Sequence, residues 1–382
     1  MKLQEFDAKQ LVQKVAGENI PFPPFFLATT PEEVKEIVQA MGKPVVVKAQ
    51  VLVGGRGKAG GIQLAQSAEE AEEKARNIFS LKIKGLPVKK VMVTEAVNIA
   101  KEYYLGIVVD RRNRTYTAMA CAEGGIDIEE LAFRAPEKIV KFPINPVEGF
   151  PPFLARQACF RAGFPPSFVP FIAGIFSMLF RVLIHYDADL LEINPLVQTA
   201  EDKILALDCK MTIDDNALIR HTDLLQYREI TEEDPLEREA REKRIAYVRL
   251  DGDIGVVGNG AGLVMCTMDA VKSAGGQPAC FLDLGGGSRA EVVRTALQIL
   301  FQDPKIKSVF INIFGGITRG DEVAKGLLQV YEELKPKVPI IIRMTGTRAE
   351  EGLQILRNSP FIPAREMMEG AQKAVMMAKR EA

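Results

Sequence analysis

Cations and glycines are concentrated in one short segment near the start of the chain. Residues 48–61 read KAQVLVGGRGKAGG, and they include Lys48, Arg56 and Lys58. Glycine tolerates positive φ and lets backbone amides approach phosphate oxygens closely, and the neighbouring cations supply the opposite charge. We therefore expect this segment to bind a polyphosphate, although a flexible glycine-rich hairpin without a ligand would show the same pattern.

Two common phosphate motifs fit this segment only in part. Gly55, Gly57 and Gly60 have the spacing of a dinucleotide-binding fingerprint, but that motif opens a helix, whereas a strand pattern, GIQLAQS, follows here. A P-loop would need Ser or Thr after Lys58 to bind magnesium, and Ala59 stands there. The pattern instead predicts a β-hairpin that closes over a triphosphate.

Side chains with oxygen ligands follow in LLEINPL, residues 190–196, and at the end of the next apolar run. Glu192 and Asn194 are two residues apart and so share one face of a strand, and Asp208 ends the later run. Antiparallel pairing of the two runs would bring all three side chains together. Such oxygen ligands suit Mg²⁺; a buried polar turn at a strand end is the alternative.

Two weaker candidates remain. Glu95 and Glu102, in VTEAVNIAKEYYLG, could accept hydrogen bonds from ribose hydroxyls, but isolated carboxylates are more often surface charges. Glycine-rich loops at 258–262 and 314–318 follow strand patterns, and the second precedes a helical pattern whose N-terminus would attract an anion. Tight turns in a parallel sheet need glycine as well, so neither loop is specific.

Bulk composition narrows the class of protein. The 382 residues, of which 47% are hydrophobic and 26% charged, indicate two or three globular domains, and a net charge of −1 excludes general attraction to nucleic acid or acidic membranes. Five scattered cysteines without a CxxC pair argue against disulfides or zinc. The start lacks a secretory signal, and the longest apolar run, 168–180, is too short for a bilayer. We expect a buried helix there and a cytoplasmic or organelle-matrix protein.

The elements that must position these residues fall into two parts. In the second part, β-rich runs at 254–257, 279–282, 308–311 and 339–343 are each followed by a glycine-rich loop and a helical pattern. This repetition predicts a flavodoxin-like, doubly wound parallel sheet with ligands at the carboxyl ends of its strands. Capping-box spacing predicts helix starts at Ser288 and at Thr347.

The first part mixes helices with longer β segments, so its class is α/β and α+β. Strands are expected at 44–52, 61–65, 91–95 and 104–110, and helices capped by Thr30 and by Ser67. The highly charged stretch 226–243 is either a linker or an exposed helix.

Taken in order, these segments resemble the β subunits of succinate–CoA ligases over nearly the whole chain. The similar segments are LQEFDAKQL, VVVKAQVLVGGRGKAGG, EYYLGIVVDR, AEGGIDIEELA, LLEINPLV, DDNALIRH, NGAGLVMCTMD, FLDLGGG and NIFGGITR. The resemblance implies an ATP-grasp domain over 1–238, with a smaller lobe at about 20–100, followed by a flavodoxin-like CoA-ligase domain over 245–382.

The resemblance also implies roles for residues that match the family. The implied positions are, for the nucleotide, Lys48, Gly55, Arg56, Gly57, Glu95, Val97 and Glu102; for Mg²⁺, Asn194 and Asp208; for positioning a phosphorylated histidine, Glu192; and for the acid substrate, Asn259, Gly316, Ile317 and Thr318.

The implied reaction forms succinyl-CoA from succinate, CoA and ATP or GTP, with ADP or GDP and phosphate released. In the family, phosphate passes through a histidine on an α subunit that also binds CoA. The chain has only His185, in an apolar helical stretch, and His221, after DDNALIR, and neither lies in a glycine-rich loop. We therefore expect the carrier histidine on a partner chain.

Several positions depart from the family pattern. Cys209 stands where Gly is usual, Thr318 where an aliphatic residue is common, and Thr345 and Arg348 where Glu and Asn are common. Because three of the four lie in the second part, a malate–CoA ligase or citryl-CoA synthetase subunit is an alternative.

Two other classes are less compatible with the sequence. A non-catalytic paralogue is disfavoured because Lys48, Asn194 and Asp208 are all present. A nicotinamide-dependent oxidoreductase is disfavoured because a strand, and not a helix, follows Gly60.

Overall fold

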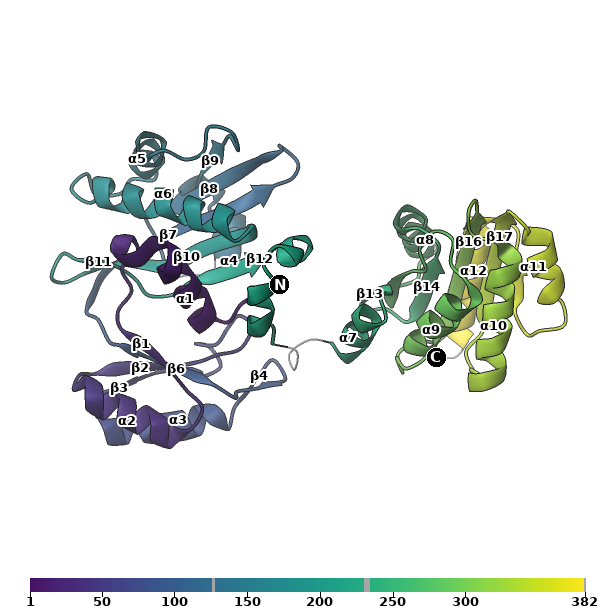
Figure 1. The fold of residues 1–382 in the computed structure, drawn as a ribbon, viewed down its shortest axis with the longest axis horizontal. Helices are drawn as coiled ribbons and strands as arrows, with labels where there is room; N and C mark the ends of the chain where they lie inside the picture. The colour runs from purple at the N-terminus through teal and green to yellow at the C-terminus, as the bar shows by residue number, and fades with distance from the viewer. Residues whose placement is uncertain (126–127, 230–233, 381–382) are drawn as a thin grey trace. The chain divides into compact units, whose positions relative to one another are not determined.

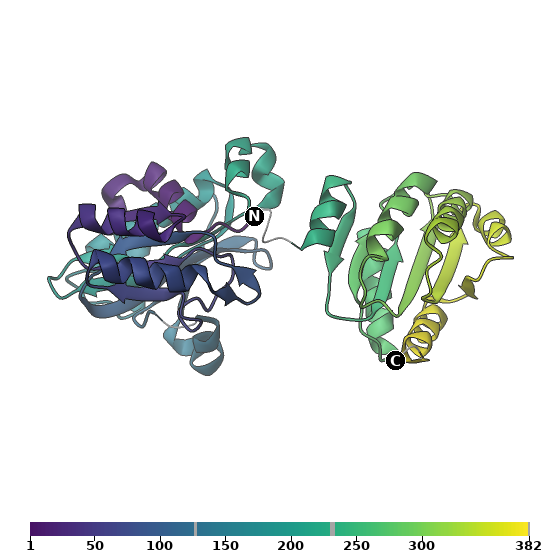
Figure 2. The same ribbon diagram turned by 90° about the horizontal axis from the view of Figure 1, so that it is seen from below.

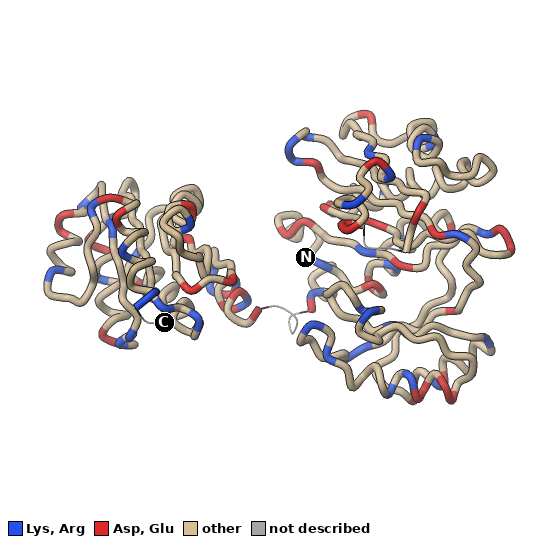
Figure 3. The backbone as a smooth tube through the Cα atoms, turned by 180° about the vertical axis from the view of Figure 1, so that it is seen from behind, with Lys and Arg blue, Asp and Glu red and all other residues tan. Residues whose placement is uncertain are grey.

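The computed structural model describes residues 1–125, 128–229 and 234–380. It forms two compact units, Met1–Glu232 and Glu233–Ala382 (Figure 1). Basic and acidic residues are interspersed along the backbone of both (Figure 3), in keeping with the small net charge. Within the described ranges, no helix is long and apolar enough to cross a membrane.

The smaller layer of the first unit is an antiparallel sheet in the order β1-β6-β2-β3. Helices α2 and α3 pack against it (Figure 1). Both helices begin at the predicted caps, because the Thr30 and Ser67 hydroxyls each accept a hydrogen bond from a backbone N–H at 3.2 Å. The bounds are β1 Phe25–Ala28, α2 Pro31–Met41, β2 Val45–Ala49, β3 Ile62–Ala65, α3 Ala68–Phe79, β4 Lys82–Ile83, β5 Leu86–Pro87 and β6 Val91–Glu95.

A larger sheet, in the order β11-β10-β7-β8-β9 with β12 beside β10, forms the rest of this unit. Helices α1, α5 and α6 share its core, and the apolar run at 168–180 lies within α6 as predicted. The bounds are α1 Glu5–Ala16, β7 Ile99–Asp110, β8 Thr115–Cys121, α4 Ile128–Arg134, β9 Val140–Ile144, α5 Pro152–Arg161, α6 Val169–His185, β10 Ala188–Thr199, β11 Ile204–Ala206 and β12 Lys210–Ile213, with short 3₁₀ helices at Gly17–Asn19, Pro136–Lys138, Asp215–Ile219 and Thr222–Tyr227.

The second unit is a six-stranded sheet in the order β13-β15-β14-β16-β17-β18, and only β13 runs antiparallel to its neighbour. Helices α8 and α12 cover one face, and α7, α9, α10 and α11 the other (Figure 2), which confirms the predicted doubly wound sheet. The bounds are α7 Pro235–Glu242, β13 Ala246–Arg249, β14 Ile254–Gly258, α8 Ala261–Ser273, β15 Cys280–Asp283, α9 Ala290–Leu300, β16 Ser308–Gly315, α10 Gly320–Leu334, β17 Ile340–Gly346, α11 Ala349–Ile355, β18 Ile362–Ala364 and α12 Met367–Arg380.

The described part of the charged stretch 226–243 ends in a helix. Residues 230–233 lie outside the described residues, but the part from Pro235 onward is α7, which packs against β13 and α9 of the second unit. Asp234 caps this helix with hydrogen bonds from the backbone N–H groups of Leu236 and Glu237. The end of the stretch is therefore part of a folded domain.

Both predicted capping boxes are wrong. Helices α9 and α11 begin at Ala290 and Ala349, and neither has a side-chain cap. The Ser288 hydroxyl donates to carbonyl oxygens of its own loop, and the Thr347 hydroxyl donates to the Gly316 carbonyl oxygen at 2.8 Å. These hydroxyls therefore stabilise the glycine-rich loops as donors to loop carbonyl oxygens, and they do not accept from the N–H groups at the helix starts.

Candidate functional site

The glycine-rich segment is the loop of a hairpin, as its pattern predicted. Strands β2 and β3 pair antiparallel on either side of it. Gly55 and Gly60 have φ values of 88° and 79°, a conformation that favours glycine, and the Gly61 N–H donates to the Arg56 carbonyl oxygen at 2.8 Å. The predicted strand 44–52 ends early, at Ala49, because the chain turns there into this loop.

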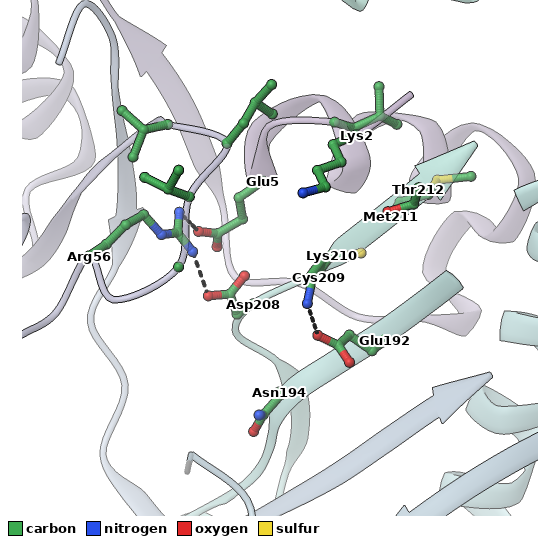
Figure 4. Close-up of a pocket in the computed structure, with 15 residues that line it drawn as sticks. Lys2, Glu5, Arg56, Glu192, Asn194, Asp208, Cys209, Lys210, Met211 and Thr212 are labelled. Atoms are coloured by element: carbon green, nitrogen blue, oxygen red, sulfur yellow. Dashed lines mark hydrogen bonds and ion pairs between the residues drawn. The ribbon is translucent and has the colours of Figure 1, made fainter. Parts of the chain in front are cut away.

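A pocket of about 200 Å³ lies beside the hairpin (Figure 4). Its polar lining comes from the N-terminal segment, the hairpin loop, β10, and the segment that joins β11 to β12. Strand β12 also contributes, and the residues are Lys2, Glu5, Arg56, Glu192, Asn194, Asp208, Lys210 and Thr212. The structure therefore brings together four residues singled out from the sequence: Arg56, Glu192, Asn194 and Asp208.

Strand pairing explains this convergence. Strand β10 pairs antiparallel with β11, where Leu196 faces Ala206, and with β12, where Glu192 faces Lys210. The segment 207–209 connects these two partners of β10, so Asp208 is held beside the middle of β10, where Asn194 lies. This is the antiparallel arrangement that the spacing of the apolar runs suggested.

A buried network of charges joins the hairpin to this pocket. One guanidinium nitrogen of Arg56 lies 2.9 Å from Oδ2 of Asp208, and the other lies 2.8 Å from Oε2 of Glu5. Lys48 lies 3.0 Å from Oε1 of Glu5, and its ammonium also donates to the Leu207 carbonyl oxygen at 2.8 Å.

Glu5 was not identified from the sequence. Its partners Lys48 and Arg56 are 43 and 51 residues away, so no local spacing points to them. The only available signals were the Glu5–Lys9 spacing on one helix face and the place of Glu5 within LQEFDAKQL.

Glu192 lies in a mixed environment. Its carboxylate accepts a hydrogen bond from the Tyr104 hydroxyl at 3.1 Å and forms an ion pair with Lys210 at 3.2 Å. Burial raises the pKa of Glu192, although Lys210 and Tyr104 act in the opposite direction. Glu192 is therefore a buried carboxylate whose two polar partners are a hydroxyl and an ammonium group.

The lining of the pocket is compatible with a hard cation that takes only some of its ligands from the protein. Asn194 and Asp208 offer an amide and a carboxylate oxygen, and the Gly125 N–H fixes the amide by donating to Asn194 Oδ1 at 2.8 Å. Among the described residues, no group of three or more His, Cys, Asp or Glu side chains could hold a metal. Two oxygen ligands, with phosphate and water completing the shell, is the coordination that Mg²⁺ accepts.

The residues expected around a base and ribose lie apart from this pocket lining. Glu95 ends β6 and forms an ion pair with Lys43 at 2.7 Å. Val97 is half-buried in the connection from β6 to β7. Glu102 lies on β7, where burial raises its pKa. All three lie along the chain where it passes from β6, in the smaller sheet, to β7, in the larger sheet.

The second unit places three glycine-rich loops side by side at the carboxyl ends of its strands. The Asn259 amide donates to the Phe314 carbonyl oxygen at 2.8 Å and accepts from the Phe314 N–H at 2.9 Å. The Thr318 hydroxyl accepts from the Gly287 N–H at 2.9 Å. Between these ties, Gly316 has open space around it and the Ile317 side chain is 86% exposed. The loop before α10 therefore presents its backbone to solvent.

The departures from the family pattern have different environments. Cys209 is buried in the core of the first unit, and burial raises its thiol pKa. Thr318 uses its hydroxyl to tie two loops together, whereas the Thr345 hydroxyl is buried without a hydrogen-bond partner in the described structure. Arg348 forms a long ion pair with Asp321 at 3.4 Å.

Neither histidine lies in a glycine-rich loop. His185 is exposed at the end of α6. His221 lies 2.8 Å from Asp187, which also accepts from Arg220. This arrangement gives His221 a structural partner.

Comparisons with known proteins agree with this architecture. Residues 2–198 match the family model of the ATP-grasp domain, and residues 257–378 match that of the CoA-ligase domain. The chain is 50% identical to the succinate–CoA ligase [GDP-forming] subunit beta of Thermus thermophilus, over 99% of both chains. It is 48% identical to the [ADP-forming] subunit beta of Chloroflexus aurantiacus over the full length of both.

A solved structure shares the fold. The ATP citrate lyase of Methanothrix soehngenii, solved with citrate and coenzyme A, matches with a TM-score of 0.72 at 19% identity, over 98% of this chain and 99% of that one. At this identity the match supports the architecture alone.

Proposed function

The chain belongs to the family of succinate–CoA ligase β subunits, and from this we propose that it binds Mg²⁺–nucleotide and exchanges phosphate with a histidine on a separate α subunit. The overall reaction converts succinate, CoA and ATP or GTP into succinyl-CoA, ADP or GDP, and phosphate. It is the reaction of an acid–thiol ligase. We further propose a cytoplasmic location, or the mitochondrial matrix in a eukaryote.

The observation that carries this proposal is the convergence of Arg56, Asn194, Asp208 and Glu192 on one pocket. A triphosphate needs cations and backbone amides for its oxygens, and a site for its metal ion. The hairpin would supply the cations with Lys48 and Arg56, and the backbone amides with Gly55 and Gly57. Asn194 and Asp208 would hold Mg²⁺, which neutralises charge on the phosphates when bound.

Roles for the remaining residues follow from their positions. Glu95, Val97 and Glu102, along the crossing between the sheets, would contact the base and ribose. Glu192 would accept a hydrogen bond from the imidazole of the carrier histidine and orient its free nitrogen toward the γ-phosphate. The bond from that phosphate to ADP breaks as the bond to the histidine forms.

The acid substrate belongs to the second unit in this proposal. Asn259 shapes the loop, and Gly316, Ile317 and Thr318 would present backbone amides to the succinate carboxylate. The carboxylate takes the phosphate from the histidine, and the CoA thiol then displaces phosphate from the acyl carbon. Phosphorylation is needed because a free carboxylate has a poor leaving group. The α subunit would supply the carrier histidine and the CoA site.

The test is to co-express the chain with its α subunit and assay the complex with succinate, malate and citrate, each with ATP and GTP. We expect CoA thioester formation with succinate and transfer of the γ-phosphate to a histidine of the α subunit. Asp208→Ala should abolish that transfer, while thioester formation from supplied acyl phosphate and CoA persists. Absence of phosphate transfer by the wild-type complex would refute the function, and preference for malate or citrate would reassign the acid.

A further inference from the structure

Glu5 is a buried carboxylate at the start of α1, with only 2% of its side chain exposed. Three cations surround it. Oε1 lies 3.0 Å from both Lys9 and Lys48, and Oε2 lies 2.8 Å from Arg56. These cations come from three places in the chain: α1 itself, the end of β2, and the hairpin loop.

The same cations also reach the segment that carries Asp208. The ammonium groups of Lys9 and Lys48 both donate to the Leu207 carbonyl oxygen at 2.8 Å, and Arg56 forms its second ion pair with Asp208. Glu5 is therefore the common anion of a network that joins the hairpin, β2 and the proposed metal segment. Figure 4 shows the part of it formed by Glu5, Arg56 and Asp208.

Charge explains why this network depends on Glu5. Burial alone would raise the pKa of Glu5, but Lys48, Lys9 and Arg56 together outweigh burial and hold that pKa well below its usual range. Glu5 is thus ionised throughout the ordinary pH range. Without it, three cations would share a desolvated volume with Asp208 as their remaining anion, and their mutual repulsion would push the hairpin arginine away.

We propose that Glu5 is a positioning residue for phosphoryl transfer, which holds Lys48 and Arg56 where they must meet the triphosphate. The inference rests on the proposed function. Both carboxylate oxygens of Glu5 are occupied by cations, so in this proposal it has no direct contact with the nucleotide, and as a nearby anion it would weaken phosphate binding by charge alone. Removal of its charge should therefore spare or strengthen nucleotide binding and still slow the chemical step, because the cations lose their geometry.

The experiment uses the complete complex with the α subunit and compares Glu5→Gln with wild type. We expect the Kd for ADP, measured by calorimetry, to rise no more than about threefold, and the single-turnover rate of α-subunit phosphorylation to fall about 100-fold. Glu5→Asp keeps the charge but shortens the reach, so we expect it to be slowed about tenfold or more.

A matched control removes another buried, ion-paired carboxylate. Asp303 in the second unit is fully buried and lies 2.7 Å from Arg249. Asp303→Asn should lower the Tm without slowing phosphorylation of the α subunit. If Glu5→Gln fails to fold, Glu5→Asp still tests whether the position of the carboxylate, and not only its charge, controls the rate.

Two results would overturn the inference: a phosphorylation rate within about threefold of wild type in the Glu5 variants, or full rate in Glu5→Asp, which would reduce the role to charge. An inactive wild-type complex would instead refute the proposed function, so the two failures are distinguishable.

Discussion

The guanidinium of Arg56 lies 2.9 Å from Oδ2 of Asp208 (Figure 4), although the two residues are 152 positions apart in the chain. The cation thus neutralises the carboxylate that we propose as a ligand of Mg²⁺. Because Arg56 already occupies Oδ2, a metal ion bound by Asp208 would place a second positive charge beside the guanidinium, and we expect it to displace Arg56. The released guanidinium is then available to the phosphates that arrive with the metal.

This competition predicts that the metal binds as a nucleotide complex. We expect Mn²⁺, used as a paramagnetic substitute for Mg²⁺, to bind at least about tenfold more weakly without ADP than with it. The reason is that phosphate oxygens can replace Asp208 as the ion-pair partner of Arg56. Arg56→Met should strengthen binding of Mn²⁺ alone and weaken binding of ADP. Electron paramagnetic resonance of free Mn²⁺ measures the first, and calorimetry with ADP measures the second. Lys58→Met, an equal charge change at an exposed position of the same loop, is the control and should leave binding of Mn²⁺ alone unchanged.

We expect the surroundings of Glu192 to control the pH dependence of α-subunit phosphorylation. Burial raises its pKa, and Lys210, at 3.2 Å, lowers it. Lys210→Met should therefore raise the pKa of Glu192 further, so that the proposed anionic form is lost at a higher pH. We expect the acid limb of the rate of α-subunit phosphorylation to move to higher pH, with Tyr104→Phe moving it in the same direction. An acid limb that stays in place in both variants would exclude Glu192 as the titrating group.

We expect the titration of Asp7 to change the stability of the protein but not its catalytic activity. Burial raises its pKa from 3.8 to about 6, against a lowering by Lys90. Since the folded state holds this proton more tightly than the unfolded state, the free energy of unfolding falls as pH rises from about 4 to about 6, and the loss persists above that range.

Asp7→Asn removes the ionisable group and with it this loss. We expect the variant to be more stable than wild type by about 1–2 kcal/mol near pH 7.5, after allowance for solvent screening at this half-buried site, and by much less near pH 4.5. Urea unfolding at the two pH values measures the difference. An equal difference at both values would contradict the predicted titration of Asp7.

We expect a specific role for the hydroxyl of Thr318, which stands where an aliphatic residue is common in the family. Its oxygen accepts from the Gly287 N–H at 2.9 Å and so links two loops of the second unit. Thr318→Val keeps the shape but removes the acceptor of this partly buried amide, which should cost about 1 kcal/mol of stability. We also expect the KM for the acid to rise about fivefold, because the exposed loop loses its anchor. Thr318→Ser retains the hydroxyl and should restore both values, and failure to do so would point to the methyl group.

Local sequence patterns determined most of the architecture. The helix caps at Thr30 and Ser67, the helix α6 with one buried face, the hairpin around Gly55 and the doubly wound second unit all follow from periodicity and turn residues within short windows. The grouping of Asn194 with Asp208 was also accessible, because consecutive strands with apolar alternation commonly pair antiparallel. These features depend on neighbours in the chain, which the sequence states directly.

The charge network was decided by the tertiary structure alone. Glu5 meets Lys48 and Arg56, and Arg56 meets Asp208, only after two sheets and a helix have packed. The hydroxyls of Ser288 and Thr347 likewise donate to loop carbonyl oxygens and do not form the predicted helix caps, because the folded loops bring those oxygens close. An ion pair or hydrogen bond is selected by distance in space, and its strength is set by the burial around it. Neither quantity is encoded in the spacing of residues along the chain.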